Sequence, residues 1–90
     1  MHFPAGWTTS ADGKRVSIAV KTEDFVDAID LFEEIAEIAE ELEHHPDLHL
    51  ESYQNVRIES YSHDVGTLTD RDAQLVARIH LLLKARHLAP

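Results

Sequence analysis

The sequence has no cysteine and few basic residues, and these two shortages exclude whole classes of protein chemistry. Without cysteine the chain has neither disulfide bonds nor thiolate metal ligands. Only 8 of its 90 residues are Lys or Arg, against 17 Asp or Glu, which gives a formal charge of −9. Binding to nucleic-acid phosphates needs a clustered positive patch, and the basic residues here are scattered. We therefore expect no direct nucleic-acid partner.

The sequence also lacks a long apolar run. No apolar stretch approaches the ~20 residues that span a bilayer. The N-terminus does not show the basic segment followed by an apolar core that is typical of a signal peptide. We expect a cytoplasmic protein with no membrane partner, folded as a single domain over residues 1–90. A domain of this size buries a modest fraction of its surface, so self-association is expected to add stability.

The first half of the chain shows the pattern of a hairpin followed by a helix. A short strand is predicted over residues 7–10, the Asp12-Gly13 pair signals a turn, and residues 15–21 alternate like a strand. Thr22 is the predicted N-cap of a helix with a broad apolar face over residues 25–43. Pro46 disfavours helical geometry at the residue before it, so the helix should end by about His44.

The second half repeats the order of two strands and a helix. Leu48 and Leu50 alternate with polar residues in a strand that closes at Tyr53, and a slip in the alternation indicates a bulge. A further strand is predicted from Val56 to about His63. Thr69 with Asp72 three residues later has the form of a capping box before the last helix. The ββαββα order predicts an α+β two-layer sandwich, with a four-stranded antiparallel sheet and helices on one face.

The strongest candidate for chemistry is the pair His44-His45, held at a predicted helix end by Pro46 and flanked by Glu40 and Glu43. Histidine titrates near neutral pH, at about 6.5 when unperturbed, so it can donate or accept a proton. A neighbouring carboxylate can orient such a ring. His63 also falls at the end of an element, where binding and catalytic groups concentrate. Asp72 stands at the start of the last helix.

Two other interpretations fit the same residues. The histidine pair could cap the helix by bonding its free carbonyls and meeting the helix dipole. Glu40, His44 and His63 could also supply nitrogen and oxygen ligands to a metal. No His-Glu-x-x-His pattern is present, so we predict no metal. From the residues alone, the cap and the proton-transfer site stay open. The isolated histidines His2, His80 and His87 are expected at the surface.

The spacing of the candidate residues resembles the signature of one family, the pterin-4a-carbinolamine dehydratases. In this sequence the signature reads Glu40-x3-His44-His45-Pro46-x6-Tyr53-x9-His63-x8-Asp72. Further similarity includes Gly6-Trp7, the Asp12-Gly13 turn, Asp24-Phe25, and Gly66-x-Leu68-Thr69. The resemblance extends from about Gly6 to Leu83, which we take as the core of the domain. Animal members of this family are also known as the dimerisation cofactor of a homeodomain transcription factor.

The resemblance implies an enzyme that dehydrates a 4a-hydroxytetrahydropterin to the quinonoid dihydropterin. This reaction recycles the pterin cofactor of aromatic amino-acid hydroxylases, and it needs no cofactor because the pterin is the substrate. The resemblance implies that His44 and His63 form the proton-transfer pair and that His45 mainly binds the pterin. The supporting or substrate-binding residues implied are Glu40, Glu43, Pro46 and Asp72.

The resemblance also implies a homodimer or homotetramer. It leaves a different class of function open, namely a non-catalytic interaction module, or another pterin pathway such as molybdopterin metabolism. The sequence departs from the family at three points. The five residues before Gly6 are too few to form the helix that usually precedes the Gly-Trp strand. Leu48 stands where many members have an aromatic residue, and Thr67 stands where a second glycine is common.

Overall fold

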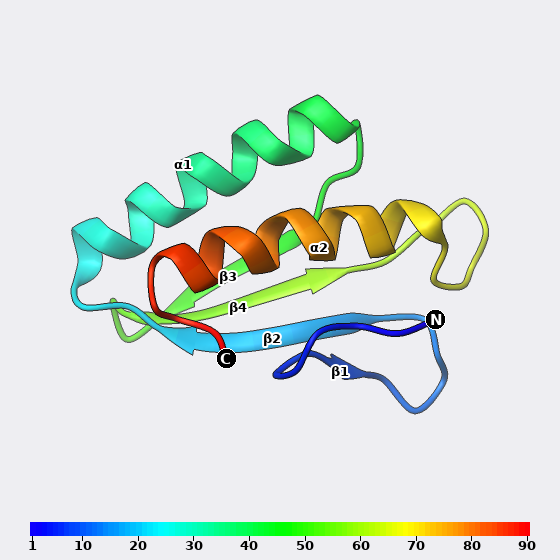
Figure 1. The fold of residues 1–90 in the computed structure, drawn as a ribbon, viewed down its shortest axis with the longest axis horizontal. Helices are drawn as coiled ribbons and strands as arrows, with labels where there is room; N and C mark the ends of the chain where they lie inside the picture. The colour runs from blue at the N-terminus through cyan, green and yellow to red at the C-terminus, as the bar shows by residue number, and fades with distance from the viewer.

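The computed structural model describes all residues, 1–90, and confirms the predicted α+β class (Figure 1). The elements in chain order are β1 (Thr8–Thr9), β2 (Val16–Lys21), α1 (Phe25–Leu42), β3 (Asp47–Glu51), β4 (Asn55–Ser60) and α2 (Asp70–Ala85). The strands form one antiparallel sheet in the order β1-β2-β4-β3. Both helices lie on the same side of this sheet, which leaves its other face open.

The register of the sheet decides which side chains face the helices. Ile18 of β2 and Leu48 of β3 both lie opposite Ile58 of β4, so an apolar row crosses the sheet. One step along β3, Asp47 lies opposite Glu59. Because side chains alternate along a strand, the apolar row points to the helices and the charged row points to the open face.

The core lies between the sheet and the two helices. Its nine buried residues are Ile18, Ala28, Leu31, Ile35, Val56, Ile58, Leu75, Ile79 and Leu83. Three of them, Ala28, Leu31 and Ile35, come from α1, so the core accounts for only part of the broad apolar face predicted for this helix. Neither helix combines the length and apolar character that crossing a membrane requires.

The start of α1 differs from the prediction. Asp24, not Thr22, is the N-cap, and its Oδ1 accepts a hydrogen bond from the Asp27 N–H at 2.8 Å. Thr22 is buried, and its hydroxyl donates to the Asp24 carbonyl at 2.9 Å. Both residue types are good caps, but the Thr22 hydroxyl is already engaged in the turn that leads into the helix.

The end of α1 agrees with the prediction that the helix stops by His44. Leu42 is the last helical residue, and Glu43 takes a left-handed conformation with φ 54°. The His44 N–H then bonds the Ala39 carbonyl at 3.2 Å. After this left-handed step the His44 side chain contacts Asp72, near the start of α2.

The predicted bulge between Leu50 and Tyr53 is wrong. β3 and β4 pair without interruption from Asp47 opposite Glu59 to Glu51 opposite Asn55. The slip in the apolar pattern instead marks the turn between the strands, where Ser52 and Tyr53 have φ values of 48° and 56°. β4 also ends earlier than predicted, at Ser60.

His80 is buried rather than at the surface. It lies on α2, and its Nδ1 accepts a hydrogen bond from Trp7 Nε1 at 3.1 Å. The indole N–H can only donate, so the His80 Nδ1 carries no proton in this arrangement. The contact ties the N-terminal segment to α2.

Candidate active site

The centre of the candidate site is a contact between the end of α1 and the start of α2. His44 Nε2 lies 2.8 Å from Asp72 Oδ1, and the carboxylate is fully buried. Asp72 is the third residue of α2 and completes the predicted capping box, in which Thr69 is the N-cap. The predicted cap is confirmed, and the same carboxylate also holds a histidine.

Asp72 accepts hydrogen bonds from five groups. Besides His44, these are the Ser60 hydroxyl at 2.6 Å, the Ser62 hydroxyl at 2.5 Å, and both the N–H and the hydroxyl of Thr69, at 2.9 Å and 3.5 Å. Burial acts to raise the pKa of Asp72, but these hydrogen bonds outweigh it and hold the pKa below the usual value for an aspartate. The group is therefore a carboxylate at neutral pH. As a pure acceptor, it requires a proton on His44 Nε2.

The other nitrogen of the His44 ring is open to solvent. Its Nδ1 has no partner in the chain, and no buried side-chain nitrogen or oxygen lacks one. Nδ1 is therefore not fully buried, although most of the ring is. With Nε2–H fixed on Asp72, Nδ1 of the neutral ring presents a lone pair, which is the arrangement of a general base.

His45 and the flanking carboxylates lie on the outside of this turn. The His45 ring is exposed and its Nε2 contacts Glu40 Oε2, one helical turn back on α1. Glu43 is exposed and serves as the left-handed cap, and Pro46 is half-buried before β3. His44 and His45 thus separate, one turned inward to Asp72 and the other outward to Glu40.

His63 lines a hollow of about 210 Å³ beside this centre. The lining residues are Lys14, Arg15, Tyr61, Ser62, His63 and Gly66. Side chains alternate in direction along residues 60–63. Ser60 and Ser62 therefore point to Asp72, whereas the rings of Tyr61 and His63 contact each other with centroids 4.1 Å apart. His44 and His45 do not line the hollow. Ser62 links the two parts, because it bonds Asp72 and lines the hollow.

Ser60, Ser62 and Tyr61 also belong to this site, although they were not predicted from the sequence. A signal for the serines existed in the strand pattern. Val56 and Ile58 occupy the buried phase of β4, and the same phase continues into Ser60 and Ser62. A polar residue in a buried phase needs a hydrogen-bond partner, and Asp72 provides it.

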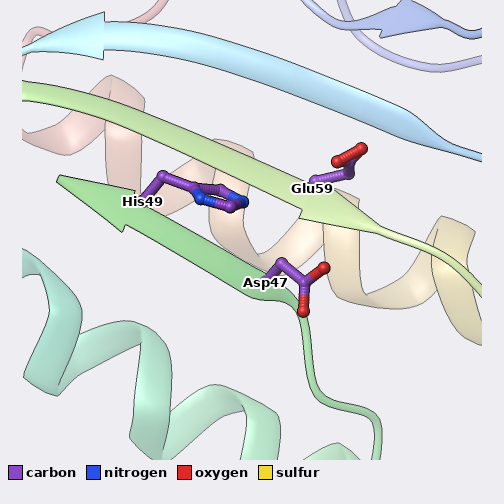
Figure 2. A group of neighbouring side chains, drawn as sticks. All are labelled: Asp47, His49 and Glu59. Atoms are coloured by element: carbon purple, nitrogen blue, oxygen red, sulfur yellow. The ribbon is translucent and has the colours of Figure 1, made fainter. Parts of the chain in front are cut away.

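Three side chains on the open face of the sheet could in principle gather around a metal ion (Figure 2). The ligand atoms of Asp47, His49 and Glu59 lie within 4.8 Å of one another. Arg15 Nη1, however, lies 3.8 Å from the Asp47 carboxylate and 3.5 Å from that of Glu59. Arg57 also pairs with Glu59, at 3.1 Å. Two guanidinium groups therefore already balance the two carboxylates, and we assign no metal there.

The residues considered as metal ligands from the sequence do not form a cluster. Glu40 contacts His45, His44 contacts Asp72, and His63 lies in its own hollow. A larger hollow of about 440 Å³ also lies on the open face of the sheet, lined by residues of β2, β3 and β4. It includes His49 and Arg57 but none of the predicted site residues, so its size does not make it the centre of the chemistry.

Comparison with known proteins identifies relatives for nearly the whole chain. The sequence model described as "Pterin 4 alpha carbinolamine dehydratase" matches residues 1–82. Pterin-4-alpha-carbinolamine dehydratase 2, mitochondrial, of Arabidopsis thaliana is 39% identical over 80 residues, which cover 87% of this chain and 43% of that protein. A protein of Saccharolobus islandicus, whose name assigns the same activity provisionally, is 38% identical over 81 residues. That match covers 90% of this chain and 81% of the archaeal protein. The chain thus spans less than half the length of the plant relative.

Solved structures share the fold. A transcriptional coactivator/pterin dehydratase from Brucella melitensis superposes with a TM-score of 0.78 at 23% identity, covering 87% of this chain and 82% of that one. A pterin dehydratase-like protein described as a RuBisCO assembly factor in the alpha-carboxysome gives 0.71 at 15% identity, covering 90% and 93%. At these identities the likeness concerns the fold alone.

Proposed function

The chain belongs to the pterin-4a-carbinolamine dehydratase family, and from this premise we propose that it dehydrates a 4a-hydroxytetrahydropterin to the quinonoid dihydropterin. In this reaction N5 loses its proton and its electron pair forms the C4a=N5 double bond. The C4a–O bond breaks, and the hydroxyl takes up a proton and leaves as water. The step therefore needs one base and one acid, and histidines can supply both.

The observation that carries the proposal is the buried His44–Asp72 pair with Nδ1 left open. We assign His44 as the base that takes the N5 proton, because Asp72 fixes the tautomer and stabilises the imidazolium that forms. His63, which lines the adjacent hollow, is assigned as the acid that protonates the leaving hydroxyl. The recycling of a hydroxylase cofactor follows from this reaction as its proposed role.

The remaining predicted residues are assigned to binding and support. His45 is exposed and is proposed to bind the pterin, with Glu40 orienting its ring. Glu43 and Pro46 fix the turn that separates the two histidines. Asp72 acts through His44 and not on the substrate.

The test follows dehydration of freshly generated 4a-hydroxytetrahydropterin by absorbance. His44→Ala and His63→Ala should each lower kcat by about 100-fold or more. His2→Ala, at the exposed N-terminus, is the matched control and should retain the wild-type rate. A wild-type protein that gives only the background rate would refute the enzyme assignment. Full activity in both variants would refute the assigned roles and leave the enzyme assignment standing.

A second candidate function is an interaction module on the same fold, and one observation favours it. Phe25, Val26 and Ile29 on the first turns of α1, which we call the α1 apolar patch, have exposed fractions of 52%, 65% and 36%. We propose that this patch binds a second copy of the chain in a homodimer or homotetramer. If the protein both dehydrates pterins and self-associates, it combines the two functions. If it self-associates but is inactive on every pterin tested, including molybdopterin precursors, it is an interaction module alone.

A further inference from the structure

The ring of Tyr61 contacts three side chains at the rim of the His63 hollow. Its hydroxyl donates to Asp47 Oδ1 at 3.1 Å. The guanidinium carbon of Arg15 lies over the ring, 4.6 Å from its centroid. The His63 ring meets it edge to face, with centroids 4.1 Å apart and an interplanar angle of 68°. Tyr61 therefore connects the charged row of the open sheet face to the histidine.

The residues that hold Tyr61 are themselves anchored. Asp47 lies on β3, directly opposite Glu59 of β4, and Arg15 lies within 3.8 Å and 3.5 Å of the two carboxylates. Burial, followed by the hydrogen bond to Asp47, raises the pKa of the Tyr61 phenol. The hydroxyl thus remains a donor to Asp47 throughout the neutral range. Tyr61 is fixed both at its hydroxyl and at one face of its ring.

His63, in contrast, has no hydrogen bond to fix its direction. It is exposed, it follows the end of β4, and its ring contact in the chain is the edge-to-face contact with Tyr61. An exposed side chain without partners exchanges rotamers freely, and a misplaced proton donor loses most of its effect. The ring of Tyr61 limits the directions that the imidazole can take.

We propose that Tyr61 is a positioning residue for His63, held in place by Asp47 and Arg15 across the open face of the sheet. This inference rests on the proposed function for its kinetic consequence, but not for its structural content. Tyr61 does not exchange protons with the substrate. It acts by keeping the His63 imidazole turned into the hollow.

The kinetic test compares variants that remove one contact at a time. Tyr61→Leu removes the ring and should lower kcat by about 10-fold with little change in KM, since the loss concerns the transition state. Tyr61→Phe keeps the ring but loses the hydroxyl, so its kcat should lie between those of Tyr61→Leu and wild type. Asp47→Asn keeps an acceptor and should recover activity that Asp47→Ala loses. Glu51→Gln changes a carboxylate on the same face that contacts neither Tyr61 nor the residues that hold it, and it serves as the matched control.

A second measurement does not depend on activity. In the free protein, NMR should show cross-peaks between the ring protons of Tyr61 and His63, and Asp47→Ala should weaken them while Glu51→Ala does not. A wild-type protein without dehydratase activity would refute the proposed function, and the cross-peaks would still decide the positioning. Absent cross-peaks in wild type, or unchanged kcat in a folded Tyr61→Leu variant of an active enzyme, would overturn the inference.

Discussion

At the scale of single residues, Asp72 connects stability to chemistry. It is fully buried and accepts from two serine hydroxyls, one backbone N–H and the His44 ring. A buried carboxylate is stable only when its oxygens are saturated in this way. The same saturation leaves His44 with one possible tautomer. The residue that caps α2 therefore also sets the proton state of the proposed base.

Asp72→Asn should lower both stability and activity. The amide brings two donors to a site whose neighbours are all donors, so the free energy of unfolding should fall by about 3 kcal/mol. It can also reverse the tautomer of His44, and kcat should fall more than the stability change explains. Urea unfolding and the dehydration assay measure the two effects. Asp70→Asn, an exposed acidic change in the same turn of α2, is the control and should change neither appreciably.

The lowered pKa of Asp72 also predicts how stability depends on pH. The unfolded chain binds a proton at this group near the ordinary value of about 3.9, and the folded chain binds it only at lower pH. The contribution of Asp72 is therefore present above about pH 4 and is lost as pH falls through the folded pKa. Chemical denaturation between pH 7 and pH 3 should show stability falling toward acid. Asp72→Asn should flatten this fall, and an equally steep fall in the variant would contradict the assignment.

At the scale of elements, the left-handed end of α1 positions the site at a cost in backbone energy. Glu43 has φ 54°, a conformation that glycine adopts without a steric penalty. Glu43→Gly should therefore raise the free energy of unfolding by about 0.5–1 kcal/mol. Glu37→Gly, in the exposed interior of the same helix, should lower it by about 1 kcal/mol. Thermal unfolding of both variants measures the contrast, and destabilisation by Glu43→Gly would show that the side chain matters more than its backbone conformation.

The elements also show which parts of the molecule the sequence could predict. Local signals sufficed for the helix end before His45-Pro46 and for the Thr69 capping box, because the residues involved lie within a few positions of one another. The N-cap of α1 was mispredicted because two good caps stand close together and tertiary contacts choose between them. The turn at Ser52 and Tyr53 was missed because neither residue is a typical former of left-handed turns.

In the site, too, the positions of the residues could be predicted from local sequence, but their contacts could not. Its members His44, His63 and Asp72 are at predicted element ends, but their contacts depend on how the elements pack. The bond from His44 to Asp72 needs the end of α1 beside the start of α2. The contact of Tyr61 with Asp47 needs the register that sets β3 against β4. Local sequence patterns predict neither contact, because both join residues that are far apart in the sequence.

At the scale of the whole molecule, the acidic charge and the α1 apolar patch act in opposite directions on association. A formal charge of −9 on a chain of 90 residues makes copies repel one another. Phe25, Val26 and Ile29 lie together at the start of α1 and expose apolar surface. At 0.1 M salt, the repulsion between charges more than about 10 Å apart is largely screened, whereas the hydrophobic attraction remains.

Association through the α1 apolar patch should therefore strengthen as salt is added. Light scattering should report a mass above that of the 10.2 kDa monomer, and the associated fraction should rise between low and moderate ionic strength. Val26→Glu places a charge in the patch and should return the protein to the monomer. Val65→Glu makes the same change at an exposed valine in the loop before α2, and it should leave the mass unchanged. A monomeric wild type at every salt concentration, or equal effects of the two variants, would exclude the patch as the contact between copies.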